Sequence, residues 1–462
     1  MTKDMTSGNS LKLIISFCIP MIIGNLLQQL YSMVDAVIVG KCIDLNALAA
    51  VGATGSICFL VIGFATGICS GFCILVSQEY GANNYSKMRK YVANSFWLSF
   101  IIAIILTVLT LVFIRPLLEL MKTPDDIIQQ ADEYLFMIFA GLSVTIFYNL
   151  LASILRALGD SRSPLIFLGI ASVINIILDY VFIEFCNMGV SGAGLATVIA
   201  QGISTVLCFI YMRKKFDILS FDKSELAFDI KASGNLMSIG VPMALQYSIT
   251  AIGSITLQTA INNLGTVYVA AVTAAQKIQM IAQGPMECLG TAMATYCGQN
   301  RGARKYERIT KGLKQSMIVS VIYCVVACIV LIAFGQYISL LFIDKNDVDV
   351  INYAMYYIKI NTVTFPLLGV LFIIRNSLQG LGYSLLPMMA GFTELIARVG
   401  VVVLLVGTYG YTGICVASPV AWLMADILLF IIAFCKFPEL KRELNGESNS
   451  YIPVSDKCKR CS

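Results

Sequence analysis

Twelve apolar runs of about 20 or more residues dominate this 462-residue sequence. Because a helix needs about 20 consecutive apolar residues to cross the hydrocarbon core of a bilayer, these runs predict transmembrane helices. Only 13% of the residues are charged, against roughly 25% in a soluble domain. The sequence therefore predicts an all-α polytopic membrane protein. The expected spans are about 11–40, 48–78, 90–114, 129–155, 163–184, 190–212, 232–262, 269–299, 313–343, 350–379, 384–408 and 413–436.

The Lys and Arg residues lie mostly in every second connection between these spans. With the N-terminus in the cytoplasm, 25 of the 32 fall on the cytoplasmic side, Arg375 among them, and four fall outside. Because positive residues favour the cytoplasmic side, both termini are predicted to be cytoplasmic. The net charge of +5 comes from short clusters between spans, so no nucleic-acid partner is expected. The three positive residues expected inside spans are Lys277, Lys359 and Arg398.

The two halves of the sequence repeat each other at an offset of 221 to 223 residues. Pro20 corresponds to Pro242, Leu158-Gly159 to Leu381-Gly382, and Gly189 to Gly410. Six spans in each half give both halves the same orientation, and two such bundles favour a transporter, although a duplicated membrane protein need not transport anything. The repeat predicts two pseudo-symmetric six-helix lobes. The expected boundaries are 1–213 for the N-lobe, 214–231 for a cytoplasmic linker, 232–437 for the C-lobe and 438–462 for a cytoplasmic tail.

Asp35 and Asp179 are carboxylates that lie inside spans of the first half. Each costs about 2.5–3.5 kcal/mol to insert at a helix centre, so such residues are candidates for function. Asn175 and Asp179 are four residues apart and share one helix face. Asp35 ends a polar stripe that also contains Gln28, a candidate substrate contact. A purely structural role, in hydrogen bonds between helices, is the alternative for both carboxylates.

A carboxylate in a membrane can be neutralised reversibly by a proton or by Na⁺, which is the chemistry of ion coupling. The sequence contains no His, so carboxylates must carry any proton. Na⁺ would require further oxygen ligands, for which Asn175 and Thr197 are candidates. The coupling ion is therefore expected to be H⁺ or Na⁺, with no other cofactor.

Three carboxylates lie inside spans of the second half. Glu287 is alone and is a candidate contact for a cationic substrate, whereas Glu394 and Arg398 are four residues apart and are expected to pair. Asp426 has no evident partner in the sequence. Cys458 and Cys461 form a CxxC motif near the C-terminus, but a four-ligand zinc site would require two more ligands.

Five short motifs follow one another along the chain: Val34-Asp35, Gln78 with Gly81-Ala82, Leu155 to Asp160, Asn175 with Asp179, and Gln299 to Ala303. In this order they resemble the multidrug and toxic compound extrusion (MATE) transporters. The resemblance covers about Leu11 to Phe437 and implies an inner-membrane antiporter that exports amphipathic, often cationic compounds while protons or Na⁺ flow inward. It also implies an N-lobe cation site at Asp35, Asn175, Asp179 and Thr197. The seventh and tenth spans lack the carboxylates that some branches of the family carry.

Other classes of function fit the sequence less well. A flippase for a lipid-linked oligosaccharide or peptidoglycan precursor is the main alternative, but it would need a more basic cavity. An enzyme is not expected, because no nucleophile–His pair, metal cluster or phosphate loop is evident. A receptor or scaffold would not explain the repeat. The expected partners are a small amphipathic molecule and the lipid bilayer, and the chain is expected to work as a monomer.

Overall fold

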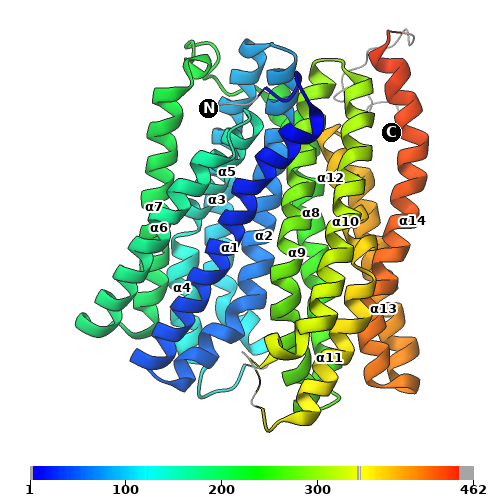
Figure 1. Cartoon of the computed structure of the whole chain (residues 1–462). Coiled ribbons are helices and arrows are strands. Elements are labelled where there is room, and N and C mark those ends of the chain that lie inside the picture. The colour runs from blue at the N-terminus through cyan, green and yellow to red at the C-terminus, as the bar shows by residue number, and fades with distance from the viewer. Residues whose placement is uncertain (1–3, 122, 341–342, 344, 447–462) are drawn as a thin grey trace. The chain divides into compact units, whose positions relative to one another are not determined.

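The structure is a computed structural model that describes residues 4–121, 123–340, 343 and 345–446, and these residues form a bundle of long helices in each half (Figure 1). The motif at Cys458 and Cys461 lies outside the described residues. The first half contains α1 (Ser10–Cys42), α2 (Leu45–Gly81), α3 (Tyr85–Leu120), α4 (Ile128–Ala140), α5 (Leu142–Ala157), α6 (Arg162–Tyr180), the π-helical turn η1 (Val181–Phe185) and α7 (Gly189–Lys215). The linker contains the short 3₁₀ turn η2 (Asp217–Leu219), and the second half contains α8 (Ile230–Asn262), α9 (Thr266–Gly302), α10 (Tyr306–Ser339), α11 (Val348–Val363), α12 (Phe365–Gly380), α13 (Leu385–Tyr409) and α14 (Tyr411–Leu444).

The helices account for the spans expected from the sequence. Within the described part of the chain, nine helices are long and apolar enough to cross a membrane, or up to eleven spans when each of two bent pairs counts as one. The remaining expected span is α9, which is more polar but has 37 residues, the same length as its counterpart α2 in the first half. The prediction of an all-α polytopic membrane protein is confirmed.

Two of the expected spans are not continuous helices, and this corrects the prediction from the apolar runs. The run at 129–155 is the pair α4 and α5, and the run at 350–379 is the pair α11 and α12; each pair is bent by 49°. Gly141 stands at the first break, where a side chain would collide with Val198 of α7. Pro366 stands in the first turn of α12 and cannot continue the α11 hydrogen-bond ladder. The equal bends support the internal repeat.

The chain divides into two compact units, and the helices α1 and α8 each belong partly to one unit and partly to the other. Unit 1 contains residues 1–4 and 19–248, and unit 2 contains residues 5–18 and 249–462. Thus α1 passes from unit 2 to unit 1 next to Pro20, and α8 passes from unit 1 to unit 2 six residues after Pro242. The lobe limits expected from the sequence stay a prediction.

The first part of α8 packs closely on α2 within unit 1. Gly71 and Gly240 meet there, and a Cβ added at Gly71 would lie 2.5 Å from the Gly240 Cα. Because neither residue has a side chain, the two backbones can approach each other directly. Glycine therefore allows α8 to begin inside the unit formed by the first half.

The N-terminal segment docks on unit 2. Met5 is fully buried; its N–H donates to Gln299 Oε1 at 3.0 Å, and its carbonyl accepts from Asn300 Nδ2 at 3.0 Å. The last turn of α9 also contacts the C-terminal helix α14, because Arg301 pairs with Glu443 at 3.1 Å. Met5 and Glu443 therefore lie at the same end of unit 2, and the cytoplasmic location of both termini stays a prediction (Figure 1).

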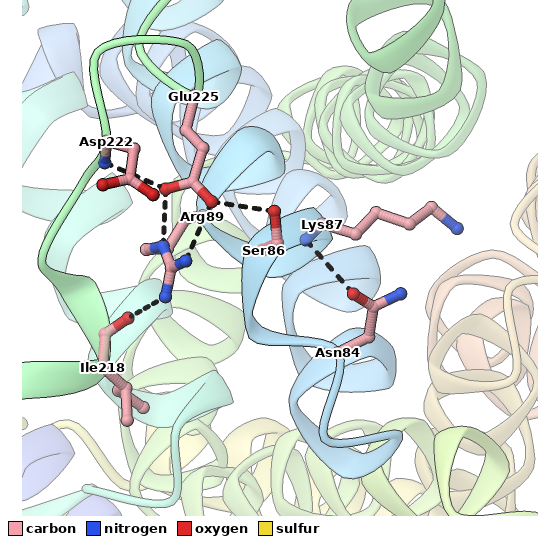
Figure 2. Close-up of polar contacts among 7 residues, drawn as sticks. All are labelled: Asn84, Ser86, Lys87, Arg89, Ile218, Asp222 and Glu225. Atoms are coloured by element: carbon pink, nitrogen blue, oxygen red, sulfur yellow. Dashed lines mark hydrogen bonds and ion pairs between the residues drawn. The ribbon is translucent and has the colours of Figure 1, made fainter.

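The linker before α8 is clamped to the start of α3 in unit 1 (Figure 2). Glu225 is 3% exposed and accepts two bonds from Arg89, Nε to Oε2 at 2.6 Å and Nη2 to Oε1 at 2.8 Å. The Ser86 hydroxyl donates to the same carboxylate at 2.8 Å, and the Asp222 N–H donates at 3.1 Å. Arg89 also donates to the Ile218 carbonyl at 3.3 Å. The Arg89 side chain thus binds the linker at two points, the Glu225 carboxylate and the Ile218 carbonyl.

Acid is expected to release this linker. The bonds from Arg89, more than those from Asp222 and Ser86, lower the pKa of the Glu225 carboxyl from 4.5 to about 2, against the effect of burial. A lowered pKa stabilises the docked linker fully above pH 4.5, and this stability is lost as the pH falls from 4.5 through about 2. The protection factors of residues 216–229, which compare hydrogen exchange in the protein with that of an unstructured chain at the same pH, should therefore fall across that range.

The substitution Glu225→Gln should loosen the linker at neutral pH. Hydrogen bonds to charged groups contribute about 1.5 kcal/mol, so exchange in the linker is expected to rise roughly tenfold. The matched control is Asp217→Asn, which changes an exposed carboxylate of the same linker. Equal exchange rates in the two variants would contradict the clamp.

Candidate functional site

The carboxyl groups of Asp35 and Asp179 meet in the interior of unit 1. Asp35 comes from the part of α1 that belongs to this unit and is 8% exposed, whereas Asp179 comes from the last turn of α6 and is fully buried. The two carboxyl groups lie within electrostatic reach of each other. The structure therefore brings together two residues that are 144 positions apart in the sequence.

Asn175 and Thr197 complete the polar group around Asp179. In the amide orientation that satisfies both ends, Asn175 donates to Asp179 Oδ2 at 3.2 Å, and its oxygen accepts from the Thr197 N–H at 3.3 Å. The Thr197 hydroxyl donates to the Ala193 carbonyl at 3.1 Å. All four residues expected at a cation site are thus grouped in unit 1, and Asn175 orients Asp179 rather than standing apart from it.

Two tyrosines beside the carboxyl groups were not among the residues expected from the sequence. Tyr31 on α1 and Tyr134 on α4 both lie within electrostatic reach of Asp35 and Asp179. Tyr31 stands four residues before Asp35, so its place on the same helix face could have been found by spacing. Tyr134 reaches the site only because α4 packs beside it, and no local pattern indicates that.

The residues present fit a proton or a small monovalent cation. One oxygen of each carboxyl group, Asp35 Oδ1 and Asp179 Oδ1, is buried and has no hydrogen-bond partner in the described structure. Unpaired polar atoms of this kind are costly in an apolar interior, and a shared proton or a bound cation would satisfy both. No group of three or more His, Cys, Asp or Glu side chains occurs within the described ranges, so a site for a divalent transition metal is not indicated there.

The two expected substrate contacts lie outside this buried group. Gln28 is exposed on α1, in the part that belongs to unit 1, and Glu287 is exposed on α9 of unit 2. Both side chains are accessible, as contact with a substrate would require. The polar stripe on α1 divides accordingly, because Gln28 and Ser32 are exposed whereas Asp35 is buried.

Unit 2 contains a buried ion-pair network that the sequence revealed only in part. Glu394 accepts from Arg398 Nη2 at 3.1 Å, which confirms the expected pair. It also accepts from Arg375 Nη2 at 2.8 Å, and Arg375 is 5% exposed inside α12. Arg375 therefore lies inside the helix bundle and not in an exposed connection, and its expected place on the cytoplasmic side stays a prediction. The buried Glu394 carboxylate compensates the charge that would otherwise keep an arginine out of the helix bundle.

An all-helical chain with two repeated bundles and buried, interacting carboxyl groups defines a polytopic membrane transport protein. A family model described as MatE matches residues 20–181 and again residues 242–404, one match in each half of the repeat. The chain therefore belongs to the MATE family. Its members are transporters, so the expectation that the chain is not an enzyme is confirmed.

Known relatives cover most of the chain. The sequence is 28% identical over 393 residues to "Probable multidrug resistance protein YpnP" of Bacillus subtilis, which covers 83% of this chain and 85% of that protein. It is 22% identical over 444 residues to "Multidrug export protein MepA" of Staphylococcus haemolyticus, with 96% of each covered. A relative from Shewanella oneidensis, 22% identical over 91% of this chain and 94% of its own length, is named "FAD transporter".

Solved structures share the fold. A transporter of the MOP superfamily from Pyrococcus furiosus superposes with a TM-score of 0.89, covering 96% of this chain and 99% of that one at 22% identity. A structure described as MATE in the bent conformation superposes with a TM-score of 0.88 over 96% of this chain and 100% of that chain, also at 22% identity. These likenesses support the fold of two six-helix lobes.

Proposed function

We propose that this chain is a cation-coupled antiporter that exports small amphipathic, often cationic drugs or metabolites. Alternating access of the two lobes would exchange H⁺ or Na⁺ for substrate across the cell (inner) membrane, with both termini in the cytoplasm. The relatives named as multidrug resistance and multidrug export proteins support this class of substrate. The chain is proposed to work as a monomer.

The observation that carries the proposal is the pair of buried carboxyl groups at Asp35 and Asp179. A polar interior that served only to hold helices together would pair its oxygens fully, as buried polar groups generally are. Here each carboxyl group leaves one buried oxygen without a partner. We propose that these two oxygens hold the coupling ion.

The residues of unit 1 can hold and release this cation. Asn175 donates to one oxygen of Asp179 and so leaves the other oxygen directed to the ion. When the ion is bound, the net charge of the carboxylate pair falls from −2 to −1, so the site costs less to enclose in the membrane. When the ion leaves, charge repulsion between the two carboxylates favours a rearrangement. The helix α1, which carries Asp35, also enters unit 2 and would transmit that rearrangement.

The flippase alternative finds less support in the positive charges. A lipid-linked pyrophosphate would need unpaired basic side chains in the transport path. Arg375 and Arg398 are both paired with Glu394 and are buried, at 5% and 6% exposure. These two buried arginines of unit 2 are therefore already paired with a carboxylate and are not available to bind a pyrophosphate.

The proposal is tested by dye efflux from proteoliposomes that contain the wild-type protein. An inward proton gradient in Na⁺-free buffer and an inward Na⁺ gradient at constant pH are imposed separately. We expect a fluorescent cationic dye to move against its own gradient with one of the two ions and not with liposomes that lack protein. That result would identify the coupling ion.

Absence of gradient-driven dye movement would refute the proposal. If neither gradient moves any of several dyes, and protease protection shows that the protein is inserted in one orientation, the antiport proposal fails. Movement of a lipid-linked precursor analogue in the same vesicles would then favour the flippase.

A further inference from the structure

Asp426 is an acidic group in unit 2 that the proposed coupling site does not use. It lies on α14, is 3% exposed, and neither oxygen of its carboxyl group has a hydrogen-bond partner in the described structure. Its helix neighbours Ala425 and Leu429 belong to the main hydrophobic core of the unit. A charged carboxylate in such surroundings has lost its hydration and gains no hydrogen bond in return. The neutral, protonated form is therefore favoured.

The charged groups around Asp426 come from the neighbouring helices. Arg375 on α12 and Glu394 on α13 both act on its carboxyl group by charge. From α11 and α10, which also contact α14, the Tyr357 hydroxyl and the Cys324 thiol enter the same hydrophobic core. Asp426 is thus the fourth charged group of the network formed by Arg375, Glu394 and Arg398.

The charge balance of this network depends on Asp426. Glu394 is shared by two guanidinium groups, so the three paired residues carry a net charge of +1. An ionised Asp426 brings the network to zero, whereas a protonated one leaves it at +1. The Nε atoms of Arg375 and Arg398 also lack partners, so a donor is present nearby for an ionised Asp426 after a side-chain rotation.

The internal repeat shows which residues of unit 2 correspond to the proposed cation site of unit 1. At the offset of 223 that aligns Gly159 with Gly382, Arg398 corresponds to Asn175 and Tyr357 to Tyr134. Tyr357 lies within electrostatic reach of Arg398, as Tyr134 lies within electrostatic reach of Asp35 and Asp179 in unit 1. The Arg398 side chain packs directly against Gly253 of α8, where an added Cβ would lie 2.6 Å from the guanidinium Nη1, so the glycine makes room for the guanidinium group. A guanidinium group therefore occupies the place in unit 2 that corresponds to Asn175, the residue that donates to Asp179 in unit 1.

We propose that Asp426 is a second proton-binding site of this transporter, located in unit 2 and balanced against the network of Arg375, Glu394 and Arg398. Uptake adds one proton from water to one carboxylate oxygen and raises the charge of the network from zero to +1. Release returns that proton to water. The site goes beyond the coupling proposed at Asp35 and Asp179 and does not depend on it.

The surroundings favour a proton over other ligands. A metal cation would need several neutral or negative oxygens, whereas two guanidinium groups lie in this network and repel it. A cationic substrate cannot reach the group, because Asp426 and the three residues of the network are all at most 6% exposed. A proton needs neither an open pocket nor a ligand shell.

Infrared difference spectroscopy of the protein in lipid nanodiscs tests the site directly. The carbonyl stretch of protonated carboxyl groups is followed between about pH 4 and about pH 9, the range over which buried carboxyl groups titrate. We expect Asp426→Asn to remove one such band and Asp426→Glu to restore it at a shifted frequency. The matched control is Glu119→Gln, an exposed carboxylate that should leave the buried bands unchanged.

Transport provides the second readout. If the proposed antiport operates with protons, Asp426→Asn should lower the number of protons moved per dye molecule by about one while Asp426→Glu keeps the wild-type value. Loss of the band in Asp426→Asn upholds the site even if Asp35→Asn and Asp179→Asn leave transport intact, in which case only the coupling proposal fails. An unchanged set of carboxyl bands in Asp426→Asn would overturn the second site whatever the transport result.

Discussion

Gradient-driven efflux is expected to fall by roughly 5- to 150-fold when either Asp35 or Asp179 is replaced by Asn, the range that corresponds to a coupling free energy of about 1–3 kcal/mol. Asn has nearly the same size as Asp but cannot become negatively charged, so the site can no longer gain and lose a cation. Efflux of a fluorescent dye from proteoliposomes under the ion gradient that drives the wild type measures the effect. Asp125→Asn, which changes an exposed carboxylate in the same unit, should transport normally.

The double variant distinguishes one shared site from two separate ones. Because Asp35 and Asp179 lie within electrostatic reach of each other, removing the second carboxylate should add little to the loss caused by the first. Melting temperatures should stay at or above the wild-type value, since each substitution removes a costly buried charge. Losses that multiply in the double variant would refute a single shared ion, and full transport in both single variants would refute the coupling site.

Most of the fold could be predicted because the bilayer allows few alternatives. Every backbone polar group in the hydrocarbon core must be bonded within the chain, so long apolar runs must be helices. The apolar run at 269–299 predicted α9 as well, although this helix is more polar than the other long helices. The bends at Gly141 and Thr364 were missed because the apolar run continues through each break, and hydrophobicity does not report a change in helix direction.

The candidate site could be predicted where its residues are neighbours on one helix. The spacing of Asn175 and Asp179 placed both on one face of α6, and the structure brings Asp35 to them. The contribution of Tyr134 could not be predicted, because it depends on how α4 packs. The same reason explains Arg375, whose partner Glu394 is 19 residues away on the next helix and not at the spacing of an intrahelical pair.

Replacement of Glu394 by Gln is expected to destabilise the protein by about 3–5 kcal/mol, the cost of leaving a buried charge without its partner. Both Arg375 and Arg398 would lose their carboxylate in a place where their side chains are 7% exposed. Thermal unfolding in detergent, followed by loss of the monodisperse peak, measures the effect. The outcome that would contradict it is a melting temperature equal to the wild-type value.

The chain supplies a matched control for this experiment in the pair of Arg115 and Glu119. That pair has the same spacing of four residues and a similar length, 3.2 Å against 3.1 Å, but its side chains are 45% and 61% exposed. Glu119→Gln should therefore cost less than about 1 kcal/mol. Once Glu394 is neutral, Asp426 is the remaining carboxylate of the network, as far as the described residues go, that can balance Arg375 and Arg398. Adding Asp426→Asn should then destabilise the protein more than it does in the wild-type background, whereas simple additivity would place Asp426 outside the network.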